Sequence, residues 1–501
     1  MRLVRPVAAG VLVAASVGLV VTGSHQPTEQ DPGTGILVAA IAAVLVGLIV
    51  SLAVLHPWWG LLAWLVASPV INVARAELWI GEIQLIPSSL IIAALGAGVV
   101  LEHAAPTSVT GRAPRVTTWI LLAAGATLAV ASSLTAPAPG EAATITLHGV
   151  LEPMAVFAVV VALRPNAREA LHALLALAAG VALATVINLV WLFVVVAPAD
   201  LYAQRMQLAR LTYFNVGIFA GMVVVALPAA GSLLFLDGRR RWGRPAGGPA
   251  WLAWLAIGLF GVALYFTYTK SASLSAAAVS AVLIVLLVPG WRARLALLLA
   301  VAALLAVVVP YPLPVLRATV PDAAAAYESF LRGLQGSERL ESWDPDTYQG
   351  SGSIGIRLVA VGAAAEMAAE SPLLGVGAGG FAREFPRVRP GADVPELQSA
   401  HNLLPNVAAE YGLPFALLVG VGLLYLVGIS LVSARRAIGE ERVVVTVLAA
   451  SLIGFLAMAT LFGVDLYRSY RTMNSDVVAA ALLAGLALSV ATRDDRRSPR
   501  T

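Results

Sequence analysis

Hydrophobic residues along this chain gather in long runs that are separated by short polar segments. We count fourteen runs, most of them close to the ~20 residues that an α-helix needs to cross a bilayer. They are residues 7–22, 36–55, 58–74, 86–102, 117–135, 145–163, 170–197, 213–236, 250–268, 272–289, 293–310, 413–432, 443–463 and 475–491, of which the third is the weakest. The pattern predicts an all-α polytopic membrane protein with about 12–14 transmembrane helices.

The composition excludes a water-soluble enzyme. Hydrophobic residues make up 59% of the 501 positions and charged residues 12%, and the mean hydropathy is +0.86. Soluble domains are about 45–50% apolar and about 25% charged. A formal net charge of +4 is too small to indicate a nucleic-acid partner. Because the chain has no cysteine, a disulfide framework, a thiolate nucleophile and a cysteine-based metal site are all excluded.

The distribution of basic residues predicts the orientation of the chain in the cytoplasmic membrane. If the N-terminus is cytoplasmic, 19 basic residues flank the spans on the inside and 6 lie in short outer loops. This asymmetry favours cytoplasmic N- and C-termini. The first run follows a basic start, as in a signal peptide, but no clear small-x-small cleavage site follows it, so an uncleaved helix is the simpler interpretation.

One long polar segment, residues 311–405, interrupts the hydrophobic runs. It divides the chain into an N-terminal part, residues 1–310 with about eleven spans, and a C-terminal part, residues 406–501 with about three spans and a basic tail. The predicted topology makes it a large extracytoplasmic loop. Within it, residues 337–353 are turn-rich, and residues 356–370 have apolar positions at helical spacing. The latter predict an amphipathic helix near the membrane surface.

The long loop contains two motifs that resemble ligand-binding sites but that we do not interpret as such. Gly375-Val-Gly377-Ala-Gly379-Gly380 satisfies the G-x-G-x-x-G pattern. A dinucleotide site also needs a preceding strand, a following helix and cytoplasmic access, so we interpret the motif as a glycine turn that allows close packing. Asp344 and Asp346 have the spacing of a metal-binding pair, but they flank a proline in a turn-rich stretch. We expect no metal there and no cofactor elsewhere.

A histidine lies where the long loop should re-enter the membrane. His401 opens the stretch that ends at Gly412, close to the outer face. Because imidazole exchanges a proton near neutral pH, His401 could act as a general base on a sugar hydroxyl. The alternative is a histidine that only hydrogen-bonds the loop. The other five histidines have no comparable setting.

Four cations are expected on the same outer face: Arg205, Arg210, Lys270 and Arg357. Their position opposes the positive-inside bias, so a compensating anion is expected, and a lipid-linked diphosphate would supply it. Each could instead pair with a nearby acid or a lipid head group. Glu152 is a carboxylate inside the sixth run and a candidate functional residue, although it could simply be protonated or paired.

Two strings resemble the bacterial O-antigen ligase and O-antigen polymerase superfamily of polyprenyl-diphosphate-dependent glycosyltransferases. They are Glu370-Ser-Pro-Leu-Leu-Gly-Val-Gly-Ala-Gly-Gly-Phe381 and Ala400-His-Asn-Leu-Leu-Pro-Asn-Val-Ala-Ala-Glu410-Tyr-Gly-Leu-Pro-Phe415. Residues 215–228 and 267–272 resemble the family more weakly, so the resemblance covers roughly residues 200–430.

The resemblance implies roles for individual residues. His401 takes the place of the loop histidine that is held essential for transfer, Arg205 or Arg210 takes the first arginine place, and Lys270 takes the second. A lysine keeps the charge but loses the planar fork of arginine, so its contact could be to one oxygen only, or the role could have moved to Arg357.

The resemblance also implies an activity, which is transfer of a glycan from an undecaprenyl-diphosphate donor to an acceptor hydroxyl at the outer face. The expected reaction is metal-independent and inverting, with His401 assisting the acceptor while Asn402 and Glu410 orient the histidine or the chain around it. The acceptor stays open, since a lipid, a growing glycan and a protein hydroxyl all fit.

Two other classes of function compete with an enzyme. A flippase for lipid-linked oligosaccharides, or another multi-span transporter, should have polar residues near the bilayer midplane, but this chain has few, namely Glu152, Asn188 and Asn72. If the protein were a membrane scaffold, replacement of His401 by alanine would change no glycan product. Because the candidate residues gather at one face beside a long outer loop, we favour the enzyme.

Overall fold

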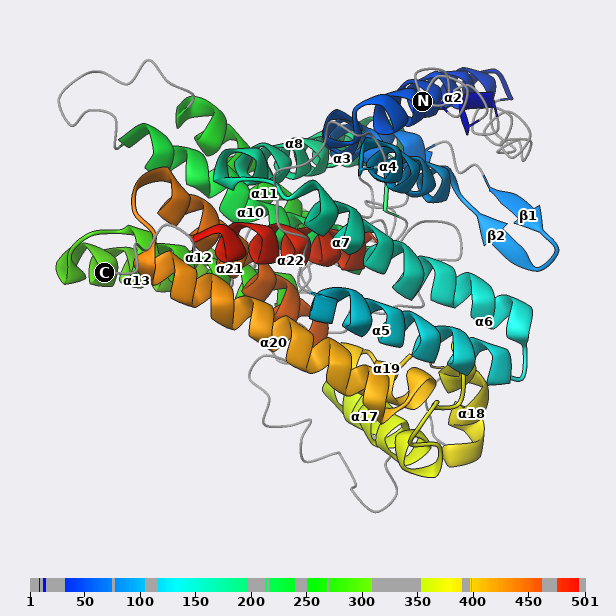
Figure 1. Cartoon of the computed structure of the whole chain (residues 1–501). Coiled ribbons are helices and arrows are strands. Elements are labelled where there is room, and N and C mark those ends of the chain that lie inside the picture. Colours follow the sequence, from blue (N-terminus) through cyan, green and yellow to red (C-terminus); the bar gives the residue numbers. More distant parts are fainter. Residues whose placement is uncertain are drawn as a thin grey trace.

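The structure is a computed structural model, and it describes residues 9, 12–14, 32–73, 77–103, 116–196, 212–213, 216–238, 250–267, 270–308, 353–389, 397, 399–461 and 475–494. Figure 1 shows a bundle of helices with one small hairpin.

The N-terminal part consists of helices and one pair of strands. They are α2 (Pro32–Leu55), α3 (Pro57–Val73), β1 (Leu78–Ile80), β2 (Ile83–Leu85), α4 (Pro87–His103), α5 (Val116–Thr135), α6 (Pro139–Thr146), the π-helical turn η1 (Leu147–Leu151), α7 (Glu152–Leu163), α8 (Ala167–Val190) and the π-helical turn η2 (Trp191–Val196). The sequence did not predict the hairpin, in which Leu78 pairs with Leu85 and Ile80 with Ile83 in antiparallel register.

The rest of the described chain is helical. Its elements are α10 (Val216–Gly238), α11 (Ala250–Thr267), α12 (Lys270–Leu287), α13 (Trp291–Val308), α17 (Ser353–Glu370), α18 (Gly380–Val388), α19 (Leu403–Tyr411), α20 (Leu413–Arg436), α21 (Gly439–Leu461) and α22 (Ser475–Asp494).

The predicted fold class is confirmed: the protein is an all-α polytopic membrane protein. Helices occupy every predicted run from the second onward. Of the first run, residues 7–22, only residues 9 and 12–14 are described, and these are helical. By length and composition, six of the described helices can cross a membrane, and six shorter ones are also apolar.

Burial separates central from peripheral helices. The spans Val216–Leu236 and Gly439–Thr460 are 78% buried, so α10 and α21 form the centre of the bundle. In contrast, α5 and α20 are 22% and 17% buried, and their apolar surfaces therefore face lipid. Between α10 and α21, the Ser451 hydroxyl donates to the carbonyl of Val225 at 2.8 Å. Such a bond helps to hold helices together inside lipid, where helix packing gains little from the hydrophobic effect.

A separate helical unit, made of α17, α18 and α19, lies at one end of the bundle beside α5 and α20 (Figure 1). The predicted helix at 356–370 is present and begins slightly earlier, at Ser353. Its apolar face, however, is covered by protein: Val359, Ala363 and Met367 are fully buried in one cluster with residues of α18 and α19. The amphipathic pattern thus reflects packing within this unit.

Candidate functional site

The glycine motif is a tight turn that fastens α17 to α19. Gly375 and Gly377 have φ of +68° and +90°, a conformation that residues with a Cβ rarely adopt. The amides of Val376 and Gly377 donate to the carbonyls of Ala409 and Glu410 at 2.8 and 3.1 Å. A Cβ at Gly375 would lie 2.4 Å from the Ala409 oxygen. Helices, not a strand, flank the turn, so the packing interpretation is confirmed.

The C-terminal end of α19 is anchored in the bundle by buried hydroxyls. Ser132 of α5 donates to the carbonyl of Glu410 at 2.7 Å. The Tyr411 phenol lies 3.1 Å from the Thr146 hydroxyl, which in turn lies 2.5 Å from the hydroxyl of Ser133. Burial, together with the charge of Glu410, raises the pKa of Tyr411 above its ordinary value, so its phenol stays neutral. These contacts fix α19 against α5 and α6.

His401 lies just before α19 in a strained backbone conformation. Its φ is +50°, and among the described residues only Arg164 shares a positive φ without being glycine. The His401 amide donates to the Ser399 hydroxyl at 3.4 Å. Such outliers in a non-glycine residue cluster at active sites, where the surrounding structure holds them in place.

A buried side chain that the sequence analysis missed holds this loop. The Asn406 carbonyl oxygen accepts the amide of Ala400 at 2.9 Å, and its nitrogen donates to the Glu410 carboxylate at 3.3 Å. Asn406 and Glu410 are 1% and 0% exposed. Glu410 therefore contacts the loop that carries His401 (residues 399–402, the histidine loop) indirectly, through Asn406, which lies one helical turn away. The i, i+4 spacing of Asn406 and Glu410 is the sequence feature that could have predicted this contact.

Asn402 anchors the start of α19 to another helix. Its amide nitrogen donates to the Thr460 carbonyl at the end of α21, at 2.5 Å. Its side chain consequently makes no capping bond to α19. No side chain therefore caps the N-terminal end of α19, which lies beside His401. This end carries the positive pole of the helix dipole, so it favours an anionic group.

The parallel arrangement of α17 and α19 brings Arg357 to the same end of the unit as His401. Both helices end at the glycine turn, and Val359 and Ala360, near the start of α17, share a buried cluster with Ala400. Arg357 is half-buried.

The other predicted cations are less fully described. Arg205 and Arg210 lie outside the described residues, as do Asp344 and Asp346. Lys270 is the first residue of α12, at a helix end, and its side chain is not described.

Two residues weighed as transporter features bond to Thr212, a described residue two positions after Arg210. Asn72 donates to the Thr212 carbonyl at 3.0 Å, and Asn188 donates to the Thr212 hydroxyl at 2.7 Å. Both asparagines are buried. They therefore fix the backbone two residues after Arg210.

An apolar groove of about 540 Å³ begins directly below the histidine loop. Leu403 and Val407 of α19 line it near one end, and Thr492 of α22 near the other. Along α22 it extends from Val477 to Thr492, fifteen residues or roughly 22 Å at the helical rise of ~1.5 Å. It is walled mainly by α5, α7, α20 and α22, two of which are the lipid-facing helices described above.

Glu152 is paired, with a histidine that the sequence analysis left aside. Its Oε1 lies 3.1 Å from Nδ1 of His148, one turn earlier, and accepts the Ser89 hydroxyl at 2.5 Å. The other ring nitrogen of His148 lies 3.0 Å from the Gln84 carbonyl. The pair thus joins η1 to α4 and to the hairpin. The i, i+4 spacing of His148 and Glu152 could have revealed it.

Ion pairs hold α18 on the outside of the unit. Arg387 bonds to Glu370 and to Glu384, and Arg383 bonds to Glu141 at the start of α6. The hydrogen bond from Arg387 lowers the pKa of Glu370 below its ordinary value.

These features define a polytopic helical membrane protein with a helical unit that presents a strained histidine above an apolar groove. Residues 251–420 match the family model described as O-antigen ligase. The match includes α17, α18 and α19 with His401, and it confirms the resemblance to the O-antigen ligase and polymerase family over that region. The chain matches no curated protein with significant similarity.

Proposed function

We propose that this protein is a membrane glycosyltransferase that moves a glycan from an undecaprenyl-diphosphate donor to an acceptor hydroxyl. The observation that supports this most is the placement of His401. It lies in a strained conformation at the uncapped N-terminal end of α19, directly above an apolar groove, within the matched region. A polar reacting group and a long hydrocarbon chain would meet at such a place.

The groove suits the lipid part of the donor, because its lining is apolar and two of its walls are lipid-facing helices. The diphosphate would then lie beside the uncapped end of α19. We propose that Arg357, Lys270 and either Arg205 or Arg210 bind its oxygens and stabilise the charge that develops as it leaves. Lysine at position 270 would contact a single oxygen.

The proposed reaction is a single displacement. The acceptor oxygen attacks the anomeric carbon, the bond from that carbon to the diphosphate oxygen breaks, and the polyprenyl diphosphate leaves. His401 takes the proton of the acceptor hydroxyl. Asn406 and Glu410 position the histidine loop, and Asn402 fixes it to α21. The configuration at the anomeric carbon inverts.

The distribution of basic residues supports an orientation. With 19 basic residues on one side and 6 in the short loops of the other, we propose cytoplasmic termini and an extracytoplasmic segment 311–405 in the cytoplasmic membrane. A lipid, a glycan or a protein would supply the acceptor hydroxyl.

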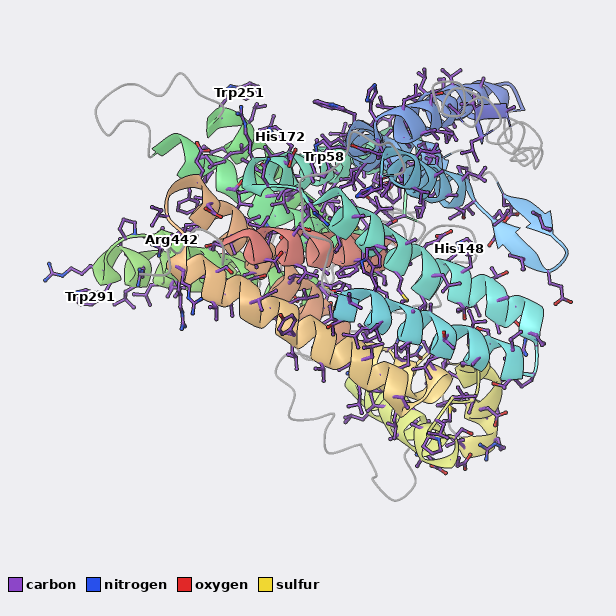
Figure 2. The ribbon with its side chains drawn as sticks, viewed as in Figure 1. Trp58, His148, His172, Trp251, Trp291 and Arg442 are labelled. Carbon is purple, nitrogen blue, oxygen red and sulfur yellow. The ribbon has the colours of Figure 1, made fainter. Side chains whose placement is uncertain are left out.

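The test is transfer from a purified undecaprenyl-diphosphate oligosaccharide by the full chain in liposomes. We expect His401→Ala to lose transfer while it still binds the donor. His172, an exposed histidine of α8 (Figure 2), is the control, and His172→Ala should act as wild type. Mass spectrometry of the released lipid diphosphate and of the product would follow the reaction and identify the acceptor.

Two outcomes would contradict the proposal. Full activity of His401→Ala at matched folding would remove the histidine from the reaction. Movement of lipid-linked glycan across the liposome bilayer without any transfer would identify a flippase instead.

A further inference from the structure

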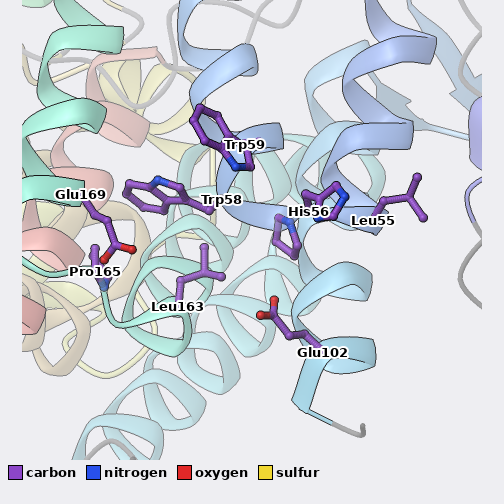
Figure 3. A pocket seen from close by; sticks show the side chains of 9 residues that line it. Leu55, His56, Trp58, Trp59, Glu102, Leu163, Pro165 and Glu169 are labelled. Atoms are coloured by element: carbon purple, nitrogen blue, oxygen red, sulfur yellow. The ribbon is translucent and has the colours of Figure 1, made fainter. Parts of the chain in front are cut away.

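A second pocket lies far from His401, at the other end of the helix formed by α6, η1 and α7. Thr146 of this helix contacts α19, whereas Leu163, at its C-terminal end, lines the pocket. The two residues are separated by seventeen positions, or roughly 25 Å of helix. The pocket has a volume of about 260 Å³ and opens where α2 meets α3, where α4 ends and where α7 meets α8 (Figure 3).

Its lining combines aromatic rings with carboxylates from different helices. His56 precedes α3, and Trp58 and Trp59 lie in its first turn. Glu102 and Glu169 come from α4 and α8. In Figure 3, the carboxylate of Glu169 lies on the side of the pocket nearest Trp58, and that of Glu102 lies on the side nearest His56. An indole face attracts a cation, and carboxylates on two sides neutralise it.

Helix dipoles add to this preference. The C-termini of α2, α4 and α7 all reach the pocket, at Leu55, Glu102 and Leu163 respectively, and each places partial negative charge there. Two N-termini, of α3 and α8, oppose them. At α8, Oε2 of Glu169 accepts the Asn166 amide in a capping box, which leaves Oε1 of the same carboxylate for the cation.

No lysine or arginine of the described residues lines the pocket. Arg164 lies in the connection between α7 and α8 and Arg168 in the first turn of α8, yet neither lines it. Among the described residues, Glu102 makes no hydrogen bond or ion pair that would occupy its carboxylate. A ring of tryptophans at a membrane boundary would by itself need no ligand. An open pocket lined by both indole rings and by two carboxylates is the feature that a tryptophan belt alone does not explain.

We propose that this pocket binds the ammonium head group of an ethanolamine phospholipid. The volume is below the ~300–1,000 Å³ of pockets for whole small-molecule ligands, which suits a head group. A lipid is the expected source because the pocket opens at the ends of membrane helices, where Trp59 is 60% exposed and head groups are concentrated. The aromatic rings contact the cation from above while the carboxylates neutralise it from the sides.

The experiment compares lipids bound to the delipidated full chain by native mass spectrometry. Phosphatidylethanolamine and phosphatidylglycerol with the same acyl chains are the probes. We expect the wild type to retain phosphatidylethanolamine at least tenfold better, and Glu102→Gln to lower that preference about tenfold, because one charge-assisted contact is lost. Glu441→Gln, a carboxylate at the start of α21 that does not line the pocket, is the matched control and should keep the preference.

Trp58→Ala tests the aromatic part, and a thermal midpoint equal to that of the wild type shows that each variant is folded. Equal retention of the two lipids, or an undiminished preference in Glu102→Gln, would overturn the proposal. Binding of soluble ethanolammonium without any lipid preference would overturn its lipid source. Transfer by the His401 site is a separate readout, so failure here leaves the proposed activity untouched.

Discussion

Replacement of Gly375 by alanine tests whether close packing of the glycine turn positions the histidine loop. The left-handed φ of +68° costs a residue with a Cβ about 1–2 kcal/mol. The new Cβ would lie 2.4 Å from the Ala409 oxygen, where ordinary contact begins at 3.4 Å, so α19 must move by about 1 Å. The total destabilisation should be about 2 kcal/mol, or slightly more.

The expected effect on activity is larger than the effect on stability. A shift of about 1 Å in a positioned group can lower the rate on the order of 100-fold. The assay is the transfer rate of the purified variant in liposomes, together with its thermal unfolding. Gly428→Ala, inside α20 with no atom within 4 Å of the added Cβ, is the control and should retain both. Wild-type transfer by Gly375→Ala would refute the positioning argument.

Three other predictions concern buried and exposed polar contacts. Asn406→Leu should lower transfer at least tenfold and stability by about 2 kcal/mol, because a buried amide loses its acceptor. Glu152→Leu should cost about 1–2 kcal/mol in the free energy of unfolding, since His148 loses its partner inside the bundle. The pKa of Glu370 is lowered by Arg387, so its stabilising contribution is full above about pH 5 and is lost as the pH falls below it.

Each of these has a measurement that decides it. Retention of activity in Asn406→Leu at normal folding would show that the histidine loop does not depend on this amide. An unchanged unfolding midpoint in Glu152→Leu would mean that the pair adds nothing to stability. For the surface pair of Glu370 and Arg387, Glu370→Gln should weaken the loss of unfolding free energy as the pH falls below about 5. An equal loss in the variant and the wild type would contradict the predicted sign.

The sequence predicted the helices well because lipid leaves a buried backbone few choices. Within a bilayer every amide and carbonyl must be satisfied internally, so a long apolar run forms a helix whatever its neighbours are. The hairpin at 78–85 was missed because it is only three residues a strand and depends on contacts made by Gln84 with Thr144 and His148.

The candidate site was predicted only in part. His401 stood out because of its motif, and the glycine turn because of its composition. Asn406 looked like an ordinary residue of a short helix, and its role depends on Ala400 and Glu410 approaching it in three dimensions.

By itself, the sequence determined the membrane class, the positions of the described spans and the family resemblance, since each depends on local hydrophobicity or on a contiguous motif. Only the tertiary structure decided which face of α17 is buried, where Asn72 and Asn188 bond, and what lies next to His401. The bond of Asn72 to Thr212, for example, joins residues 140 positions apart, and no local pattern encodes such a contact. Packing in three dimensions brings such distant residues into contact.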